Sequence, residues 1–322
     1  MSRIIDIHAH VVHRETFGAA GSYGPDLGDE EHLQTFRVGD YSIRVPYIGS
    51  VFMEVEKRIQ EMDRLGIDIQ MPSPNPLTFF GGIASNEADN FAKLSNDAMA
   101  NLVQKYPDRL LGTIALPMQD PEAACAELQR GVNELGLVGG YIGMDYGFTL
   151  DDPRLDDFYR TVVELDIPLF IHPATNDGIR SSADSRLGRF GLELVVGYAY
   201  EETLAVAALI LGGVMDRHPK IDICVSHGGG AATFLAKRFD SMASFQGTES
   251  DFVSALRTLW YDSHLEPGAA HDYVVSMVGK DRMVYGTNFG GWDTPDETTE
   301  FDRSLGTNAE RLLRLPPAKE EN

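Results

Sequence analysis

The chain has 322 residues, of which 43% are hydrophobic and 24% are charged, so it can bury a sizeable core, and wholesale disorder is excluded. Its 49 acidic residues outnumber its 27 basic residues and give a formal net charge of −22 at pH 7. A chain with this net charge repels other polyanions over long range, which excludes nucleic acid and anionic membranes as expected partners. An anionic substrate is expected only where arginine or a metal ion reverses the local field.

Strands and helices are predicted to alternate from the N-terminus onward. Residues 3–10 form a first strand, and residues 14–50 form an insertion that contains a small hairpin around residues 36–45. Residues 52–65 then have apolar side chains at helical spacing, and Gly66 is a suitable residue to end that helix.

The rest of the chain repeats the order of one strand followed by one helix. Asn86 is expected to cap the first of these helices, and Pro121 is expected to begin the second. The strands are predicted at residues 67–74, 110–118, 138–144, 167–173, 220–230, 259–264 and 282–289. The helices are predicted at residues 86–105, 121–135, 152–165, 199–213 and 231–243, with one more before the last strand and one at the C-terminus.

The resulting count of eight strands suits a (β/α)8 TIM barrel, although a doubly wound sheet gives a similar count. The strand at 167–173 is almost entirely apolar, as in a parallel sheet that is covered on both faces. Polar residues and histidines end strands along the whole chain, and TIM barrels place their active sites at those strand ends. We therefore predict an α/β TIM barrel, with residues 1–322 as one domain and residues 14–50 as an insertion.

The two cysteines, Cys125 and Cys224, are far apart and lack CxxC spacing, so neither a disulfide framework nor a cysteine-ligated zinc site is expected. We expect both thiols to be buried. The N-terminus has no signal-peptide pattern, and no apolar run reaches about 18 residues, so no transmembrane helix is expected. The cytoplasm is the expected compartment.

Four histidines stand at the ends of three predicted strands. His8 and His10 end the first strand, where alternation puts both imidazoles on one face, and His172 and His227 end two later strands. One such pair, or one histidine in an apolar strand, is more often structural than functional. Together, the four favour a site for a divalent metal such as zinc, because neutral imidazoles are good ligands for it.

The strand-end motifs resemble the amidohydrolase superfamily, and in particular its branch of aromatic acid and α-amino-β-carboxymuconate-ε-semialdehyde decarboxylases. The motifs are DIHAH (6–10), FIHP (170–173), SHGGG (226–230) and YGTNF (285–289). The stretches at residues 58–70, 111–124, 210–231 and 278–289 also resemble that branch, so the likeness covers nearly the whole chain. The resemblance implies one divalent metal, zinc or else manganese, held by His8, His10 and His172, with His227 as an acid/base group.

The chain departs from the family pattern at Asn288, where the family normally carries a catalytic, metal-binding Asp. Asn can ligate through its carbonyl oxygen, but it is neutral and is not a base. We therefore predict Asn288 as a weakened fourth metal ligand and catalytic-site residue. Asp293 supplies a nearby carboxylate only if its loop folds back, and a solvated loop position is the expectation.

Several further residues are predicted to bind the substrate. Arg238 matches an arginine that reaches a substrate carboxylate across a dimer interface in that branch, which implies a homodimer; a surface ion pair with Asp240 is the alternative. Guanidinium groups suit carboxylates because they donate two parallel hydrogen bonds. The other candidates follow strands or lie in loops: Arg44, Asn75, Phe79, Arg180, His264 and Trp292.

The resemblance implies a non-oxidative decarboxylase that acts on a small aromatic or muconate-type carboxylate. Hydrolysis of an amide, lactone or C–C bond is the nearest alternative, and hydration of a double bond is another, because the same site chemistry can serve them. A non-catalytic binding protein on a decayed barrel is a third alternative, which the retained histidines disfavour.

Overall fold

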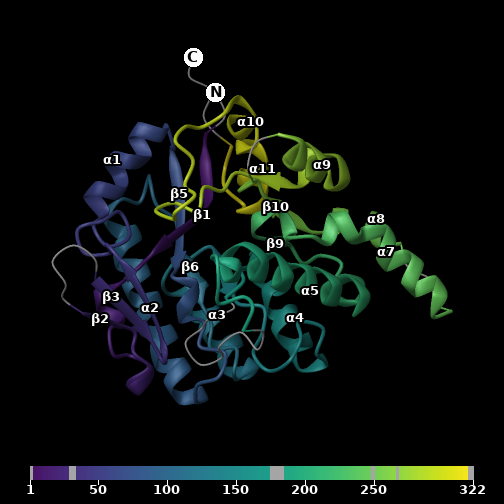
Figure 1. Cartoon of the computed structure of the whole chain (residues 1–322). Coiled ribbons are helices and arrows are strands. Elements are labelled where there is room, and N and C mark those ends of the chain that lie inside the picture. The colour runs from purple at the N-terminus through teal and green to yellow at the C-terminus, as the bar shows by residue number, and fades with distance from the viewer. Residues whose placement is uncertain (1–2, 29–33, 175–184, 248–250, 266–267, 318–322) are drawn as a thin grey trace.

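The computed structural model describes residues 3–28, 34–174, 185–247, 251–265 and 268–317, and Figure 1 shows strands at its centre and helices around them. Among these residues, eight strands run parallel to their neighbours. They are β1 (Ile5–Val11), β5 (Ile69–Pro74), β6 (Thr113–Ala115), β7 (Gly139–Ile142), β8 (Leu169–Ile171), β9 (Ile223–Val225), β10 (Trp260–Asp262) and β11 (Met283–Val284).

Two seams join the strands into a closed ring. Strands β6 to β11 form one sheet in chain order, and β1 pairs with β5. A parallel bridge between Gln70 and Leu110 connects β5 to the start of the larger sheet. A second bridge between Ala9 and Phe289 connects β1 to its end. A doubly wound sheet has two open edges, whereas these bridges close both, and the predicted TIM barrel is confirmed.

Apolar side chains from seven of the eight strands form one cluster in the barrel, and helix α11 (Gly306–Leu312) adds Ala309 and Leu312 to it. The register of β1 against β5 shifts between Asp6 and Ala9. This irregularity lets two consecutive residues both contact interior groups: Ile7 belongs to the apolar cluster, and the ring of His8 lies 5.0 Å from that of His172.

The helices follow the predicted order, with differences at their ends. Gly66 ends the first helix in a left-handed conformation, and Pro121 begins the third helix, as predicted for both positions. Asp120 caps that helix and was not predicted. The prediction that Asn86 is a cap is wrong, because Ser85 is already helical and Asn86 lies inside the first turn. The helices are α1 (Val55–Leu65), α2 (Ser85–Lys105), α3 (Pro121–Asn133), α4 (Asp156–Glu164), α5 (Tyr198–Leu211), α6 (Val214–Arg217), α7 (Ala232–Phe245), α8 (Phe252–Ala255), α9 (Ala269–Val278), α10 (Glu300–Arg303) and α11.

The early insertion contains the predicted hairpin, formed by β3 (Gln34–Val38) and β4 (Tyr41–Val45). A third antiparallel strand, β2 (Asp26–Gly28), pairs with β3 and was not predicted. The sheet lies beside α2 at the margin of the barrel (Figure 1), and Phe36 and Phe91 belong to the cluster that joins them.

One apolar helical segment, Glu193–Leu211, satisfies the length and composition of a membrane span, with a mean hydropathy of 1.6. The sequence analysis expected no such segment. Only 33% of it is buried, but Leu209 is in the core and Glu202 contacts His227, so α5 packs against the barrel and exposes an apolar face. Of the two cysteines, Cys224 is buried as predicted, whereas Cys125 is only half-buried, contrary to the prediction.

Candidate metal centre and active site

Three buried histidines converge at the end of the barrel strands. His8, His10 and His172 each offer a ring nitrogen, and these nitrogens lie within 4.8 Å of one another. The ring centroids are 4.9–5.1 Å apart, with the planes of the rings nearly perpendicular. The cluster brings together two distant parts of the chain, because His8 and His10 come from β1 and His172 directly follows β8.

Hydrogen bonds at Nδ1 fix the orientation of two of these rings. Nδ1 of His8 lies 2.6 Å from Oδ2 of Asp262, and Nδ1 of His172 donates to the carbonyl of Pro173 at 2.7 Å. The Nε2 atoms of His8 and His172 are buried and have no hydrogen-bond partner among the described residues. A buried nitrogen lone pair without a partner is costly in an apolar interior, and a metal ion bound here would supply the missing partner.

The third ring is held in the same way by a serine. Nδ1 of His10 lies 3.1 Å from Oγ of Ser73, and that hydroxyl donates to the carbonyl of Ala9 at 3.0 Å. Because the serine proton is used there, Nδ1 of His10 donates to Ser73 and Nε2 carries the lone pair. All three imidazoles therefore have the tautomer that leaves Nε2 free for a cation.

Burial keeps the three imidazoles neutral. Burial lowers the pKa of His10 to about 3, with neighbouring positive groups contributing in the same direction. Burial and the other histidines also lower the pKa of His8 and of His172 well below the usual value. A neutral imidazole is the form that ligates a metal, so no proton has to leave before binding at neutral pH.

His227 differs from these histidines because it pairs with a buried carboxylate. Its ring lies 4.9 Å from that of His8 and 5.1 Å from that of His172, and its Nδ1 lies 2.5 Å from Oε1 of Glu202. Burial lowers the pKa of His227, but the Glu202 carboxylate raises it by more, to about 9. The imidazole is therefore protonated at neutral pH, with Nε2 as the remaining N–H donor.

Asn288 is linked to a carboxylate by its own loop. Its Nδ2 donates to Oδ1 of Asp293 at 2.7 Å, and Oδ2 of Asp293 accepts from Nε2 of His264 at 3.0 Å. The expectation that Asp293 is solvated is wrong, because its side chain is only 20% exposed. The loop folds back through a bond from the N–H of Gly291 to the carbonyl of Asn288 at 2.7 Å.

Two backbone features occur at this site. His227 and Asn288 adopt positive φ angles of 46° and 48°, which are uncommon for residues with side chains and occur often at functional sites. Gly286 lies so close to its neighbours that a Cβ there would stand 2.7 Å from Cβ of His8 and 3.1 Å from Cβ of Asp262. Glycine at 286 therefore allows β1 and β10 to bring His8 and Asp262 together.

A cleft of about 780 Å³ opens beside the cluster, and His227, His264 and Asp293 are among the residues that line it. Clefts of roughly 300–1,000 Å³ hold most small-molecule ligands. The ring of His227 lines this cleft, within reach of a small molecule that enters it. His227 is more exposed than the three buried histidines, His8, His10 and His172.

Known proteins share the sequence of this chain over most of its length. The sequence profile of the amidohydrolase family matches residues 5–315, which is nearly the whole chain. The chain belongs to the amidohydrolase family. A 2-amino-3-carboxymuconate-6-semialdehyde decarboxylase from Dictyostelium discoideum is 29% identical over 348 residues, covering 98% of this chain and 92% of the relative. A γ-resorcylate decarboxylase from Rhizobium sp. (strain MTP-10005) is 28% identical, covering 82% of this chain and 88% of the relative.

A solved structure extends the likeness to three dimensions. A mutant of 5-carboxyvanillate decarboxylase from Novosphingobium aromaticivorans DSM 12444 matches with a TM-score of 0.71 and 28% identity, covering 82% of each chain. That structure contains manganese and 3-methoxy-4-hydroxy-5-nitrobenzoic acid. The comparisons confirm the predicted family and the predicted class of enzyme, because these relatives are carboxy-lyases.

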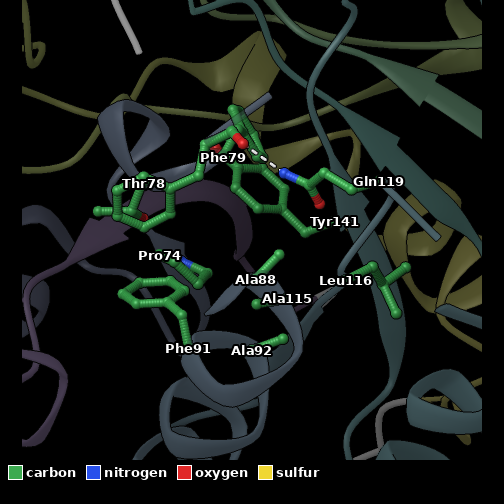
Figure 2. A pocket seen from close by; sticks show the side chains of 11 residues that line it. Pro74, Thr78, Phe79, Ala88, Phe91, Ala92, Ala115, Leu116, Gln119 and Tyr141 are labelled. Carbon is green, nitrogen blue, oxygen red and sulfur yellow. Dashed lines mark hydrogen bonds between the residues drawn. The ribbon is translucent and has the colours of Figure 1, made fainter. Parts of the chain in front are cut away.

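Two predicted substrate residues of this amidohydrolase, Phe79 and Asn75, follow β5 in the chain. The ring of Phe79 lies 4.9 Å from that of Tyr141, and Tyr141 in turn lies 6.2 Å from His172. Figure 2 shows both rings at a cavity of about 20 Å³, which is large enough for one water molecule and too small for an aromatic ring. Asn75 is buried and serves as a cap, since its Oδ1 accepts from the N–H of Leu77 at 3.0 Å.

His264 lines the cleft described above, whereas three other predicted substrate residues lie on the surface and one lies outside the described residues. Arg44 is exposed on β4, and Arg238 is exposed on α7. Trp292 is 72% exposed, so it does not form a buried wall of a pocket. Arg180 lies outside the described residues, and its role stays a prediction.

Some residues that shape the site were missed by the sequence analysis. Asp262 ends β10 within WYDSH, in the same strand-end position as the histidines, so the pattern that found them also applies to it. Glu202 is a buried acid in a mostly apolar helix, and a buried carboxylate requires a hydrogen-bond or charge partner. The ring centroid of Tyr198 lies 5.7 Å from that of His172 and 5.9 Å from that of His227, and no sequence motif indicates these contacts.

Proposed function

We propose that this amidohydrolase is a metal-dependent, non-oxidative decarboxylase of an aromatic or muconate-type carboxylate. The observation that carries the proposal is the contrast between three neutral histidines that converge on one point and the protonated His227 beside them. The first group is suited to holding a cation, and the second is suited to donating a proton. A metal-assisted decarboxylation of an aromatic acid uses both functions.

The donor set fits one divalent metal ion. His8, His10 and His172 would hold the ion through Nε2, and the carbonyl oxygen of Asn288 would be the weaker fourth donor. We propose zinc because imidazole nitrogen suits it, with manganese, which a solved relative contains, as the alternative. When bound, the ion supplies a Lewis acid that orients the substrate and polarises its oxygen atoms.

His227 is the proposed proton donor. Its Nδ1 is occupied by Glu202, so Nε2–H transfers its proton to the ring carbon that carries the carboxylate. The bond between that carbon and the carboxylate then breaks, its electron pair returns to the ring, and CO2 leaves. The products are CO2 and the arene with hydrogen in place of the carboxylate, so no oxidant or reductant is needed.

The apolar face of α7 supports the proposed homodimer. Phe234, Arg238, Met242 and Phe245 are spaced to lie along one side of the helix, and all four are exposed, with Phe245 86% exposed. Figure 1 shows α7 extending away from the barrel. A second copy of the chain would cover this face and could take Arg238 into its own substrate site, as proposed from the resemblance.

Substitutions on this face are expected to dissociate the dimer. Phe234→Asp and Phe245→Asp each place a charge in the apolar interface, and we expect light scattering after gel filtration to report a monomer for both. Leu94→Asp is the control, because Leu94 is an exposed apolar residue on α2, away from this face. A wild-type chain that is monomeric at micromolar concentration would contradict the proposal.

Turnover is the direct test of the proposed function. Metal content per chain would first be measured by elemental analysis, and the protein would then be given dihydroxybenzoates and muconate-type acids. We expect CO2 and the corresponding decarboxylated product, an arene in the case of the dihydroxybenzoates, in equal amounts. Hydrolysis or hydration of a carbonyl or alkene substrate without CO2 would favour the alternative reactions, and a chain that takes up no metal would overturn the mechanism.

Asn288→Asp is expected to tighten metal binding. The new carboxylate attracts a divalent cation by at least about 1 kcal/mol, which corresponds to a Kd about fivefold lower or more. The metal-free variant brings two carboxylates together at positions 288 and 293, and a bound cation relieves their repulsion. Chelator competition with Zn²⁺ and with Mn²⁺ measures this change, and an unchanged Kd would show that residue 288 does not contact the ion.

A further inference from the structure

The loop that follows β11 places one carboxylate between two groups at the edge of the histidine cluster. Oδ1 of Asp293 accepts from Asn288 at 2.7 Å, and Oδ2 accepts from His264 at 3.0 Å. The ring of His264 lies 5.5 Å from the rings of His8 and His227. Asp293 therefore connects the neutral residue of the proposed metal site to the wall of the substrate cleft.

The carboxylate determines which way the amide of Asn288 faces. A carboxylate oxygen only accepts hydrogen bonds, so Nδ2 of Asn288 must face Asp293. The carbonyl Oδ1, which is the atom able to bind a cation, is then directed to the other side of the planar amide group. Without Asp293, the amide has no such preference between its two orientations.

Groups other than the Asp293 side chain also hold this loop closed. The hydroxyl of Thr294 lies 3.0 Å from the carbonyl oxygens of both Asn288 and Gly291, and its single proton is shared between them. A Cβ at position 291 would stand 2.5 Å from Nδ2 of Asn288, so glycine there permits the turn to close on the amide. The side chain of Asp293 is thus available for a role other than holding the loop.

We propose that Asp293 is a positioning residue that supplies, one hydrogen bond away, the negative charge that Asn288 lacks. Its two oxygens orient the Asn288 carbonyl toward the bound metal ion and fix the imidazole of His264 at the cleft. This inference rests on the proposed metal site. It assigns to one carboxylate in the loop two tasks: to strengthen a neutral donor and to hold one wall of the substrate cleft.

The test compares metal affinities of matched variants of the full-length chain. Asp293→Asn keeps the shape and removes the charge, and Asp293→Ala removes both. We expect each to raise the Kd for Mn²⁺ and for Zn²⁺ by about 10- to 100-fold, the usual effect of losing an outer hydrogen-bond partner of a ligand. Asp296→Asn is the control, because it removes the same charge from an exposed position in the same loop.

A double variant tests whether the charge itself matters. Asn288→Asp combined with Asp293→Asn exchanges the two side chains, so the amide at position 293 donates to the carboxylate at position 288. We expect this exchange to return the Kd toward the wild-type value. A double variant as weak as Asp293→Asn, or single variants with the affinity of Asp296→Asn, would overturn the proposal even if their Tm is lowered.

These outcomes are distinct from failure of the proposed function. Metal affinity is measured without turnover, so a chain that binds metal through this pair and releases no CO2 refutes only the decarboxylase. If the wild-type chain takes up no metal, the proposed function fails. The 288–293 pair is then judged in the metal-free protein from the Tm of Asn288→Ala, Asp293→Ala and the double variant, where additive shifts would overturn it.

Discussion

His172→Ala is expected to remove most of the bound metal and to abolish turnover while the barrel stays folded. The imidazole offers one of three neutral nitrogens that converge on one point, and its Nε2 has no other partner in the described part of the chain. Loss of an outer partner costs about 10- to 100-fold in metal affinity, so loss of a ligand should cost more than about 100-fold. Elemental analysis measures the metal content, a CO2 assay measures turnover, and circular dichroism measures whether the barrel is folded.

A histidine outside the cluster provides the control for this substitution. His218 is also partly buried and bonded to a carboxylate, with its Nε2 3.2 Å from Oδ1 of Asp156 on α4. We expect His218→Ala to keep the full metal content. Full retention of metal by His172→Ala would contradict the ligand assignment, whereas loss of metal together with loss of the circular dichroism signal would show only that the barrel unfolded.

The strand-end histidines could be predicted from sequence because a parallel barrel brings the ends of its strands together. His8 and His172 are 164 positions apart, yet His8 lies within β1 and His172 directly follows β8. The convergence of strand ends in a barrel is independent of sequence distance. The position of a residue at a strand end does not determine how that strand is aligned with its neighbour. The shift in β1 between Asp6 and Ala9, which lets both Ile7 and His8 face interior groups, depends on pairing with β5.

The carboxylates around the histidines were harder to predict because their partners lie far away in sequence. Glu202 contacts His227 from α5, across 25 positions, and Asp262 contacts His8 across 254 positions. Asp293 shows the opposite limit: its partner Asn288 is only five positions away, but the turn between them depends on specific backbone hydrogen bonds. A loop without periodicity gives no sign of such a turn.

Glu202→Gln is expected to lower the rate at pH 8 far more than at pH 6. The Glu202 carboxylate raises the pKa of His227 to about 9, so the proton donor is present below that pH and is lost as pH rises through it. A neutral glutamine removes this attraction, and burial then lowers the pKa of His227. The fall in kcat/KM on the alkaline side should therefore move to lower pH, and kcat should drop because general acid catalysis contributes about 10²- to 10⁴-fold.

A neighbouring serine separates the charge of Glu202 from its hydrogen bonding. Oγ of Ser226 donates to Oε1 of Glu202 at 2.9 Å, the same oxygen that His227 contacts, so Ser226→Ala removes one bond and keeps the carboxylate. We expect the alkaline fall of Ser226→Ala to stay near that of the wild type. Equal alkaline profiles for Glu202→Gln and the wild type would contradict the assignment, because the protonation of His227 would then not control the reaction. A shifted profile with unchanged metal content would place the effect on proton transfer, since the three cation-binding nitrogens belong to other residues.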